Sequence, residues 1–314
     1  MTASNEQRIA ARTIETDATA QGQRLDNFLI KTLRRVPRTR IYQMIRKGEV
    51  RINKKRIKPD YKLAPGDLIR IPPIHQQQPD NPAPIIAKYW LEQLEPLILF
   101  ENAHFIVINK PSGLAVHAGS GVDFGVIDIM RRLRPDSDME LVHRIDLDTS
   151  GCLLLARHRQ ALLALQHCFQ NNSIVKVYTA MVKGVWPADV SCISYRLRKS
   201  QMSNGERRVY VDPAGQPART LVLDRQTNGR CSLLTLQLLT GRTHQIRVHC
   251  QAQGHQIVGD HKYGDRHFNR SMRKQGIKRL MLHACRIELP QTAYNQEMVI
   301  NAPVPLHFNL NCKN

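Results

Sequence analysis

The chain has 314 residues, of which 42% are hydrophobic and 23% are charged, so it has room for about two globular domains. Its 46 Lys and Arg residues outnumber its 26 Asp and Glu residues, which leaves a formal net charge of +20 at pH 7. This charge favours a polyanionic partner, most commonly nucleic acid. A membrane surface is the competing polyanion, but no apolar run approaches the roughly 20 residues that span a bilayer, so we expect no membrane-spanning segment.

The cysteines indicate a reducing compartment. They are spread singly, and no two have the Cys-x-x-Cys spacing of a zinc site or a redox motif. The N-terminal segment also lacks the apolar core of a secretion signal. We therefore expect a cytoplasmic protein in which most cysteines are small core residues, at positions 152, 168, 192, 231, 250, 285 and 312.

Basic residues are concentrated near the N-terminus. Residues 24–71 hold 15 Lys and Arg against 4 Asp and Glu, so more than half of the excess positive charge lies in less than a sixth of the chain. This distribution predicts a separate basic module at residues 22–71, preceded by a flexible N-terminal tail at residues 1–21.

Within this module, apolar spacing predicts two helices followed by short strands. Residues 24–33 carry one apolar helical face, and a second helix opens near Pro37 and ends at Gly48, which suits the left-handed conformation. Residues 50–57 alternate like two short strands around an Asn-Lys turn, and residues 68–71 supply another strand. A unit this small has few possible functions other than binding another molecule.

Residues 72–87 are predicted to be a linker. Residues 72–84 contain five prolines and three consecutive glutamines, with almost no large apolar side chain to build a core. Such a segment tethers the basic module without fixing its orientation.

Residues 88–314 are predicted to form a second domain. Runs of strands with only occasional helices favour an α+β domain with a largely antiparallel central sheet over a doubly wound fold. Helical spacing covers residues 160–170, and apolar runs predict strands at 97–100, 105–108, 152–156, 177–182 and 233–238.

The polar stretch at residues 143–151 is the first candidate site. It places His143, Arg144 and Asp146 directly before the apolar run at 152–156, which is typical of a buried strand. A carboxylate held at such a strand end beside basic side chains is a catalytic candidate. The same residues also fit a solvated loop with a weak surface ion pair, and their spacing alone does not separate the two interpretations.

A second polar stretch, residues 240–249, follows another predicted strand. Thr243 is the expected N-cap of a helix on which His244 and Arg247 lie one turn apart. If the two strand ends meet, Arg247 holds the Asp146 carboxylate ionised and oriented. The spacing alone does not establish that they meet.

Other chemistries have weaker support in the sequence. Residues 119–125 approach a dinucleotide-binding fingerprint, but the third glycine is one position late and no strong strand precedes it. The 13 histidines form no zinc motif. Asp146 and Asp148, joined by Asp260 or Asp265, are a conceivable magnesium site of a nuclease, although Arg144 beside them opposes cation binding.

The motifs of the second domain resemble those of the RluA family of pseudouridine synthases. Residues 143–151, with the sequence HRIDLDTSG, differ from the family signature at Ile145, where leucine is more usual, and Gln256 stands where proline is common. Residues 22–71 resemble an S4-type RNA-binding domain. The motifs occur in order and span nearly the whole chain, with further matches at residues 109–117, 176–184, 241–249 and 254–260.

This resemblance implies an enzyme that isomerises uridines to pseudouridine in large-subunit ribosomal RNA. The reaction changes no oxidation state and imports no group, so neither a cofactor nor a metal is expected. By the same resemblance, Asp146 is the essential carboxylate, Arg247 is its ion-pair partner, and Tyr178 stacks on the base and is a candidate to assist proton removal at C5. Substrate contacts are expected from His143, Arg144 and His244, and from Arg38, Arg46, Lys47, Lys54, Lys55 and Arg56 of the S4-like module, with Arg40 beside them.

The expected partner is therefore ribosomal RNA, and the enzyme is expected to act as a monomer without a membrane partner. Two rival functions stay open, a non-catalytic RNA-binding or ribosome-assembly protein and a metal-dependent RNA nuclease. The sequence also leaves open whether Asp146 attacks ribose C1′, adds to the uracil ring or removes a ribose proton.

Overall fold

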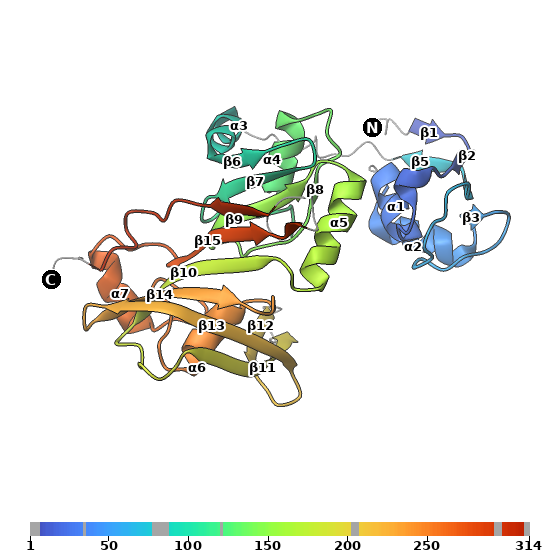
Figure 1. Ribbon diagram of the computed structural model, residues 1–314. Helices are drawn as coiled ribbons and strands as arrows, with labels where there is room; N and C mark the ends of the chain where they lie inside the picture. Colours follow the sequence, from blue (N-terminus) through green and yellow to red (C-terminus); the bar gives the residue numbers. More distant parts are fainter. Residues whose placement is uncertain are drawn as a thin grey trace, which may run out of the picture. The chain divides into compact units, whose positions relative to one another are not determined.

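The computed structural model describes residues 7–33, 36–76, 88–119, 122–201, 207–291 and 297–310 (Figure 1). The chain divides into two compact units, an N-terminal unit (Met1–Ile85) and a C-terminal unit (Ile86–Asn314). None of the helices within the described ranges combines the length and the apolar character that crossing a bilayer requires.

The N-terminal unit packs two helices on a three-stranded antiparallel sheet. The predicted helices are confirmed as α1 (Leu25–Thr32) and α2 (Arg38–Lys47), and α2 ends at Gly48, whose φ of 72° is left-handed. Buried apolar side chains of both helices share one core with those of the sheet. The sheet order is β2 (Arg12–Glu15), β4 (Leu68–Ile71), β3 (Arg51–Ile52), and a short 3-10 helix, η1, covers Ala18–Ala20.

The prediction of a flexible tail at residues 1–21 is wrong for its described part. All four residues of β2 pair with β4, from Arg12 opposite Ile71 to Glu15 opposite Leu68. The Thr16 hydroxyl then donates a hydrogen bond of 2.6 Å to a backbone carbonyl of the same unit. An edge strand like β2 is held mainly by backbone hydrogen bonds, so its sequence carries little apolar signal.

The predicted linker also begins with ordered structure. β5 (Ile74–Gln76) pairs antiparallel with β1 (Gln7–Ile9), and Ile74 is buried. Pro72 and Pro73 precede the strand, where a missing N–H does not interrupt the ladder. The linker therefore starts later than its composition suggests, and residues 77–87 lie outside the described residues.

The hairpin predicted at residues 50–57 is shorter than expected. β3 has only two residues, and a single bridge joins Ile52 to Lys55 across the turn. Asn53 and Lys54 form that turn with φ values of 50° and 67°, the left-handed conformations that a tight two-residue hairpin requires. The turn leaves the side chains of Lys54 and Lys55 exposed.

The C-terminal unit is built on one large sheet that is mainly antiparallel, which confirms the predicted fold class (Figure 1). Its strands are β6 (Ile98–Glu101), β7 (Phe105–Lys110), β8 (Glu140–Leu141), β9 (Ser150–Ala156), β10 (Val175–Lys183), β11 (Cys192–Gln201), β12 (Arg207–Val211), β13 (Gln216–Thr227), β14 (Cys231–Leu238), β15 (Leu282–Leu289) and β16 (Met298–Asn301). The main path runs β12–β11–β13–β14–β10–β15–β9–β7–β6, with β16 beside β15 and β8 beside β9. Among the described strands, β9 and β15 form the one parallel pair.

Helices cover both faces of the sheet around β7 and β9. Leu154 and Ala156 of β9 enter the core that includes the apolar side of α5, whereas Leu153 and Leu155 enter the core that includes α4. This alternation explains why β9 is apolar at nearly every position. The helices are α3 (Lys88–Leu94), the 3-10 helix η2 (Glu95–Leu97), α4 (Val126–Leu133), α5 (Arg159–Gln170), α6 (Gln245–Ala252) and α7 (Arg266–Lys274).

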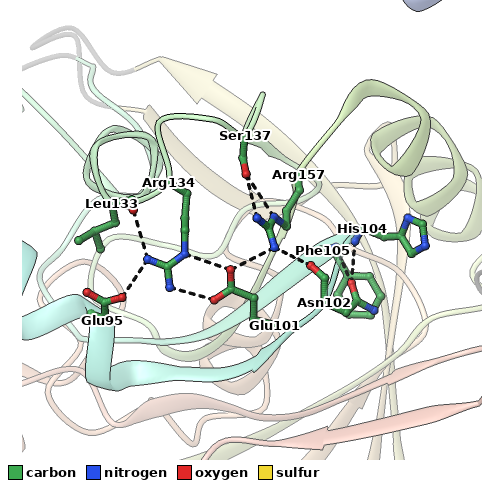
Figure 2. A network of polar contacts seen from close by, with 9 residues as sticks. All are labelled: Glu95, Glu101, Asn102, His104, Phe105, Leu133, Arg134, Ser137 and Arg157. Carbon is green, nitrogen blue, oxygen red and sulfur yellow. Dashed lines mark hydrogen bonds and ion pairs between the residues drawn. The ribbon is translucent and has the colours of Figure 1, made fainter.

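A network of ion pairs fastens the end of β9 to neighbouring elements (Figure 2). Arg134, which follows α4, donates to both carboxylate oxygens of Glu101 at the end of β6, at 3.0 and 2.9 Å. Arg157, which follows β9, forms an ion pair with the same Glu101 at 3.2 Å and donates to the Ser137 hydroxyl. The pKa of Glu101 is lowered by the hydrogen bond from Arg134. One end of β9 is thereby fixed, and Asp146 precedes its other end.

Candidate active site

A cavity of about 300 Å³ opens where the chain enters β9 and where β14 turns into α6. It is lined by residues of both polar stretches identified in the sequence, together with Tyr178 and Lys176 from β10 and Phe169 from α5. The two stretches thus meet, as the hypothesis about Arg247 requires. The lining residues are His143, Arg144, Ile145, Asp146, Thr149, Phe169, Lys176, Tyr178, Leu238, Gly241, Arg242, Thr243, His244, Gln245, Ile246, Arg247 and Leu282.

Arg247 connects Asp146 to a second, fully buried carboxylate. Its Nη1 donates to Asp146 Oδ2 at 3.1 Å, while its Nε and Nη2 donate to the two oxygens of Asp260 at 2.7 and 2.9 Å. A bidentate pair of this kind fixes the plane of the guanidinium. The third nitrogen of Arg247 therefore reaches Asp146 in a set direction. In the described part of the chain, no hydrogen bond is made to Asp146 Oδ1, which leaves that oxygen available to a substrate.

The charges of this pair stabilise one another. Burial alone would raise the pKa of Asp260, but the Arg247 guanidinium and the backbone N–H groups of Tyr263 and Lys262 outweigh it and hold that pKa below its ordinary value. Burial alone would lower the pKa of Arg247, yet the hydrogen bonds and charge of Asp260, followed by those of Asp146, raise it. Arg247 is therefore a permanent, oriented cation beside Asp146.

His244 faces Asp146 from the start of α6. Its φ of 53° is left-handed, and the N-cap position belongs to His244 itself, not to Thr243 as the sequence suggested. The Tyr263 hydroxyl oxygen accepts a hydrogen bond from Val209 N at 3.0 Å and lies within hydrogen-bonding distance of His244 Nδ1, 2.8 Å away. The other ring nitrogen of His244, Nε2, lies 3.9 Å from Asp146 Oδ2. Burial lowers the pKa of His244.

Tyr178 presents a buried phenol to the cavity. Burial, and after it the negative charge of Asp146, raise the pKa of the hydroxyl. Within the described residues the hydroxyl makes no hydrogen bond, and Tyr178 lines the same cavity as Asp146. The arrangement keeps the phenol neutral and favours its use as a stacking surface and hydrogen-bonding group.

His143 is anchored to the protein more firmly than the sequence suggested. Its Nε2 accepts the backbone N–H of Leu154 at 3.0 Å, and its ring stacks on Phe169 with centroids 4.9 Å apart. Burial lowers the pKa of His143 to about 3, with a further contribution from the charge of Lys176. His143 therefore forms part of the cavity wall as a neutral ring, whereas Arg144 lines the cavity with an exposed side chain.

A buried lysine holds the loop that follows Asp146. The Lys110 ammonium, at the end of β7, donates to the carbonyl oxygens of Pro111, Leu114 and Leu147 at 2.8, 2.7 and 2.8 Å. Burial lowers the pKa of Lys110 to about 7. Because Leu147 follows Asp146 directly, these bonds restrict the position of the carboxylate.

The basic residues expected to contact RNA in the N-terminal unit are all exposed, on α2 and the following turn. One of them, and one neighbour of the set, also serve the fold. Arg56 donates to the Arg46 carbonyl at 2.7 Å, and its side chain lies over Gly48, where a Cβ would come within 2.5 Å of it. Arg40, beside the set, is paired with Glu49 at 2.8 Å.

Four residues of the site were not predicted from the sequence to take part in it. Asp260 was weighed only as a metal ligand, and Lys110, Lys176 and Tyr263 were given no role. In the part of the chain that the structure describes, His, Cys, Asp and Glu side chains do not gather in groups of three or more that could hold a metal ion. The one available signal was that Lys110, Lys176 and Asp260 lie in or at the end of motifs that resemble a known family.

Comparison with known proteins identifies the family. Residues 104–252 match the RNA pseudouridylate synthase family model, and residues 23–69 match the S4 domain model. The ribosomal large subunit pseudouridine synthase C of Pasteurella multocida is 46% identical over 285 residues, which are 90% of this chain and 87% of that protein. The chain belongs to the RNA pseudouridine synthase family. The resemblance noted in the sequence is thereby confirmed, and the synthase is an isomerase.

Further relatives agree with this assignment. The protein of the same name from Escherichia coli is 43% identical to the synthase over 300 residues, which cover 94% of the synthase and 93% of that protein. Among solved structures, human RNA Pseudouridylate Synthase Domain Containing 1 matches with a TM-score of 0.58 at 27% identity, covering 71% of the synthase and 88% of that chain.

Proposed function

We propose that the synthase converts specific uridines of large-subunit ribosomal RNA to pseudouridine, with Asp146 as the catalytic carboxylate. The observation that carries this proposal is the carboxylate of Asp146 in a cavity, oriented by an arginine that Asp260 fixes in turn. The class of RNA is supported by the names of relatives that are 43–46% identical over most of the chain.

The reaction places few demands on the protein beyond orientation and charge. The bond between ribose C1′ and uracil N1 breaks, the base turns, and a bond forms between C1′ and C5. The proton lost from C5 balances the one gained at N1, so the product is an isomer of the substrate. The free Oδ1 of Asp146 suits three steps that the geometry does not separate: attack on C1′, addition to the uracil ring, and removal of a ribose proton.

The neighbours of Asp146 have separate tasks in this proposal. Arg247 orients the carboxylate and, being charged at all times, offsets its negative charge when substrate excludes water. Tyr178 stacks on the uracil ring, and its raised pKa disfavours a role as a phenolate base. His244 faces Asp146 with its Nε2 atom, and Arg144 contacts the RNA backbone at the cavity mouth.

The target uridine has to leave its stack to reach the cavity, which costs a few kcal/mol. The exposed basic residues of the N-terminal unit supply binding energy through phosphate contacts that do not depend on sequence. We propose that these residues are Arg38, Arg46, Lys47, Lys54, Lys55 and Arg56. We also propose that the synthase acts in the cytoplasm, together with its ribosomal RNA substrate.

An Asp146→Asn variant tests the proposal, because it keeps the shape of the side chain and removes its charge. Pseudouridines are mapped in the ribosomal RNA of a strain lacking the gene, complemented with wild type or variant. We expect the sites restored by wild type to stay unmodified with Asp146→Asn. Wild-type modification by a stably folded variant would refute the role of Asp146, and unchanged ribosomal RNA in the deletion strain would refute the proposed substrate.

A further inference from the structure

The catalytic cavity contains a buried cation that lacks a counter-ion. Lys176 is only 9% exposed, and it lines the cavity from β10. Within the described residues, it forms no ion pair and no hydrogen bond to a carboxylate, and burial lowers its pKa. Its ammonium lies 5.5 Å from the centre of the Phe169 ring.

The other cations of the unit that are similarly buried have clear acceptors. Arg247 contacts two carboxylates, and Lys110 donates to three carbonyl oxygens. A charge removed from water without such partners is costly, so proteins seldom retain one without a use. The contact with Phe169 offsets only part of this cost, since a cation–π interaction is weaker than the hydration that a buried charge loses.

Among the residues that the structure describes, no other residue of the cavity supplies the missing negative charge. Asp146 is the one acidic side chain among its described lining residues, and that carboxylate is paired with Arg247. Arg144 and Arg242 add further positive charge at the rim. The cavity therefore carries more positive than negative charge, and it is suited to an anionic ligand.

The position of Lys176 also fits a nucleotide. Lys176 and Tyr178 are two residues apart on β10 and line the same cavity, so both side chains point to the same face of the strand. Their backbone positions are about 6.6 Å apart along the strand. A nucleotide whose base stacks on Tyr178 can place a phosphate of its own backbone at Lys176.

We propose that Lys176 binds a phosphate next to the target uridine and that this phosphate is the counter-ion its buried ammonium lacks. This inference rests on the proposed function, because it takes an RNA nucleotide as the occupant of the cavity. It adds a second anchor to the flipped nucleotide, at a residue to which the sequence analysis gave no role. In the free protein, the unpaired charge of Lys176 is expected to lower stability. Binding of the substrate phosphate should remove this loss.

Two measurements on the full chain separate this role from a purely structural one. Lys176→Met keeps the length and apolar stem of the side chain and removes the charge. In the free protein we expect its melting temperature to rise by about 2–4 °C, because an uncompensated buried charge is gone. With an RNA fragment that wild type modifies, we expect KM to rise about 10- to 100-fold, which is the effect of losing a charge-assisted hydrogen bond. The rise in KM should exceed any fall in kcat. Lys176→Arg should recover most of the affinity, and Lys278→Met, an exposed lysine outside the cavity, should change neither value.

A neutral phosphate identifies the partner directly. RNA fragments carrying one methylphosphonate linkage, either 5′ or 3′ of the target uridine, should bind wild type about 10-fold or more weakly at one of the two linkages. Lys176→Met should be insensitive at that linkage, so the two changes should not add. Additive losses at both linkages, or a loss confined to kcat, would overturn the proposal.

The inference and the proposed function fail in different ways. If wild type modifies no ribosomal RNA, the proposed function is wrong. The role of Lys176 can then still be tested by comparing the affinity for uridine monophosphates with the affinity for uridine. A preference for the monophosphate that Lys176→Met abolishes supports the anion site. An equal preference in both proteins rejects it.

Discussion

The two units use the same kind of residue in opposite ways. In the N-terminal unit, the cations proposed to meet RNA are exposed, and Lys47, Lys54 and Lys55 have no ion-pair partner among the described residues. In the C-terminal unit, Lys110 and Arg247 are buried and held by several oxygen atoms each. Exposed cations attract a polyanion over a distance and are screened by salt, whereas buried ones fix the geometry of a site. Charge density in the sequence reveals only the first kind.

The largest difference between the units should appear when an arginine is removed from each. Arg247→Met leaves Asp260 buried without its partner, and we expect it to lower the free energy of unfolding by about 3–5 kcal/mol. Arg40→Met breaks the half-exposed pair with Glu49 and should cost at most about 1 kcal/mol. Urea unfolding of the full chain measures both values, and similar losses would contradict the comparison.

Activity sharpens this first test. Adding Asp260→Asn to Arg247→Met removes the unpaired charge, so the double variant should regain part of the lost stability. It should not regain pseudouridine formation, because Asp146 still lacks its orienting partner. Recovery of activity together with stability would show that Arg247 serves only the fold.

Acid should affect the C-terminal unit through its buried histidines. His249 and His283 are fully buried, and burial lowers the pKa of each to about 4, below the ordinary value of 6.5. Between pH 6.5 and 4 the two histidines bind protons in the unfolded chain but not in the folded chain, so stability falls as the pH falls through this window. Each histidine should lower the free energy of unfolding by about 2 kcal/mol between pH 6.5 and 5.

Matched histidine variants test the sign and the source of this effect. His249→Gln should flatten the loss of stability between pH 6.5 and 5, measured by urea unfolding. His267→Gln, an exposed histidine of the same unit, should leave the pH dependence unchanged. A wild type that becomes more stable on acidification would refute the assignment.

The sequence predicts those parts of the molecule that follow a local pattern. Apolar spacing located α1, α2 and α5, and the apolar run at 152–156 located β9. β2 was not predicted because an edge strand is held by backbone hydrogen bonds and buries few side chains. His244 in place of Thr243 at the start of α6 escaped because a left-handed non-glycine residue has no simple sequence signal.

The candidate site divides in the same way. Motifs pointed to Asp146 and Arg247, but their contact depends on strands that are about 100 residues apart in the chain. Asp260 was weighed as a metal ligand because a sequence does not show that a carboxylate already has a cationic partner. Lys176 was missed because a lysine in an alternating strand is normally exposed, and only the packing of Phe169 and His143 around it reveals its burial.

The smallest effect on stability should come from the exposed cations of the N-terminal unit, which are expected to matter only for RNA. Replacing Lys47, Lys54 and Lys55 together by glutamine should change the free energy of unfolding by no more than about 0.5 kcal/mol, because the three side chains are exposed. Binding to RNA should nevertheless weaken by about 10-fold at moderate salt, since each lost phosphate contact reduces the counter-ions released. The slope of log Kd against log salt concentration should fall by about 2 if all three residues contact phosphate.

The control for this test removes the same charge from the other unit. Arg225, Lys274 and Lys278 are exposed in the C-terminal unit and do not line the cavity that contains Asp146. Replacing them by glutamine lowers the net charge equally, so any effect of overall charge on RNA affinity appears in both triple variants. If the two salt slopes change by the same amount, the basic residues of α2 and its turn act only through net charge. A change confined to the N-terminal triple means that these lysines lie against the RNA backbone, and that exposed and buried cations divide the work of binding and chemistry between the two units.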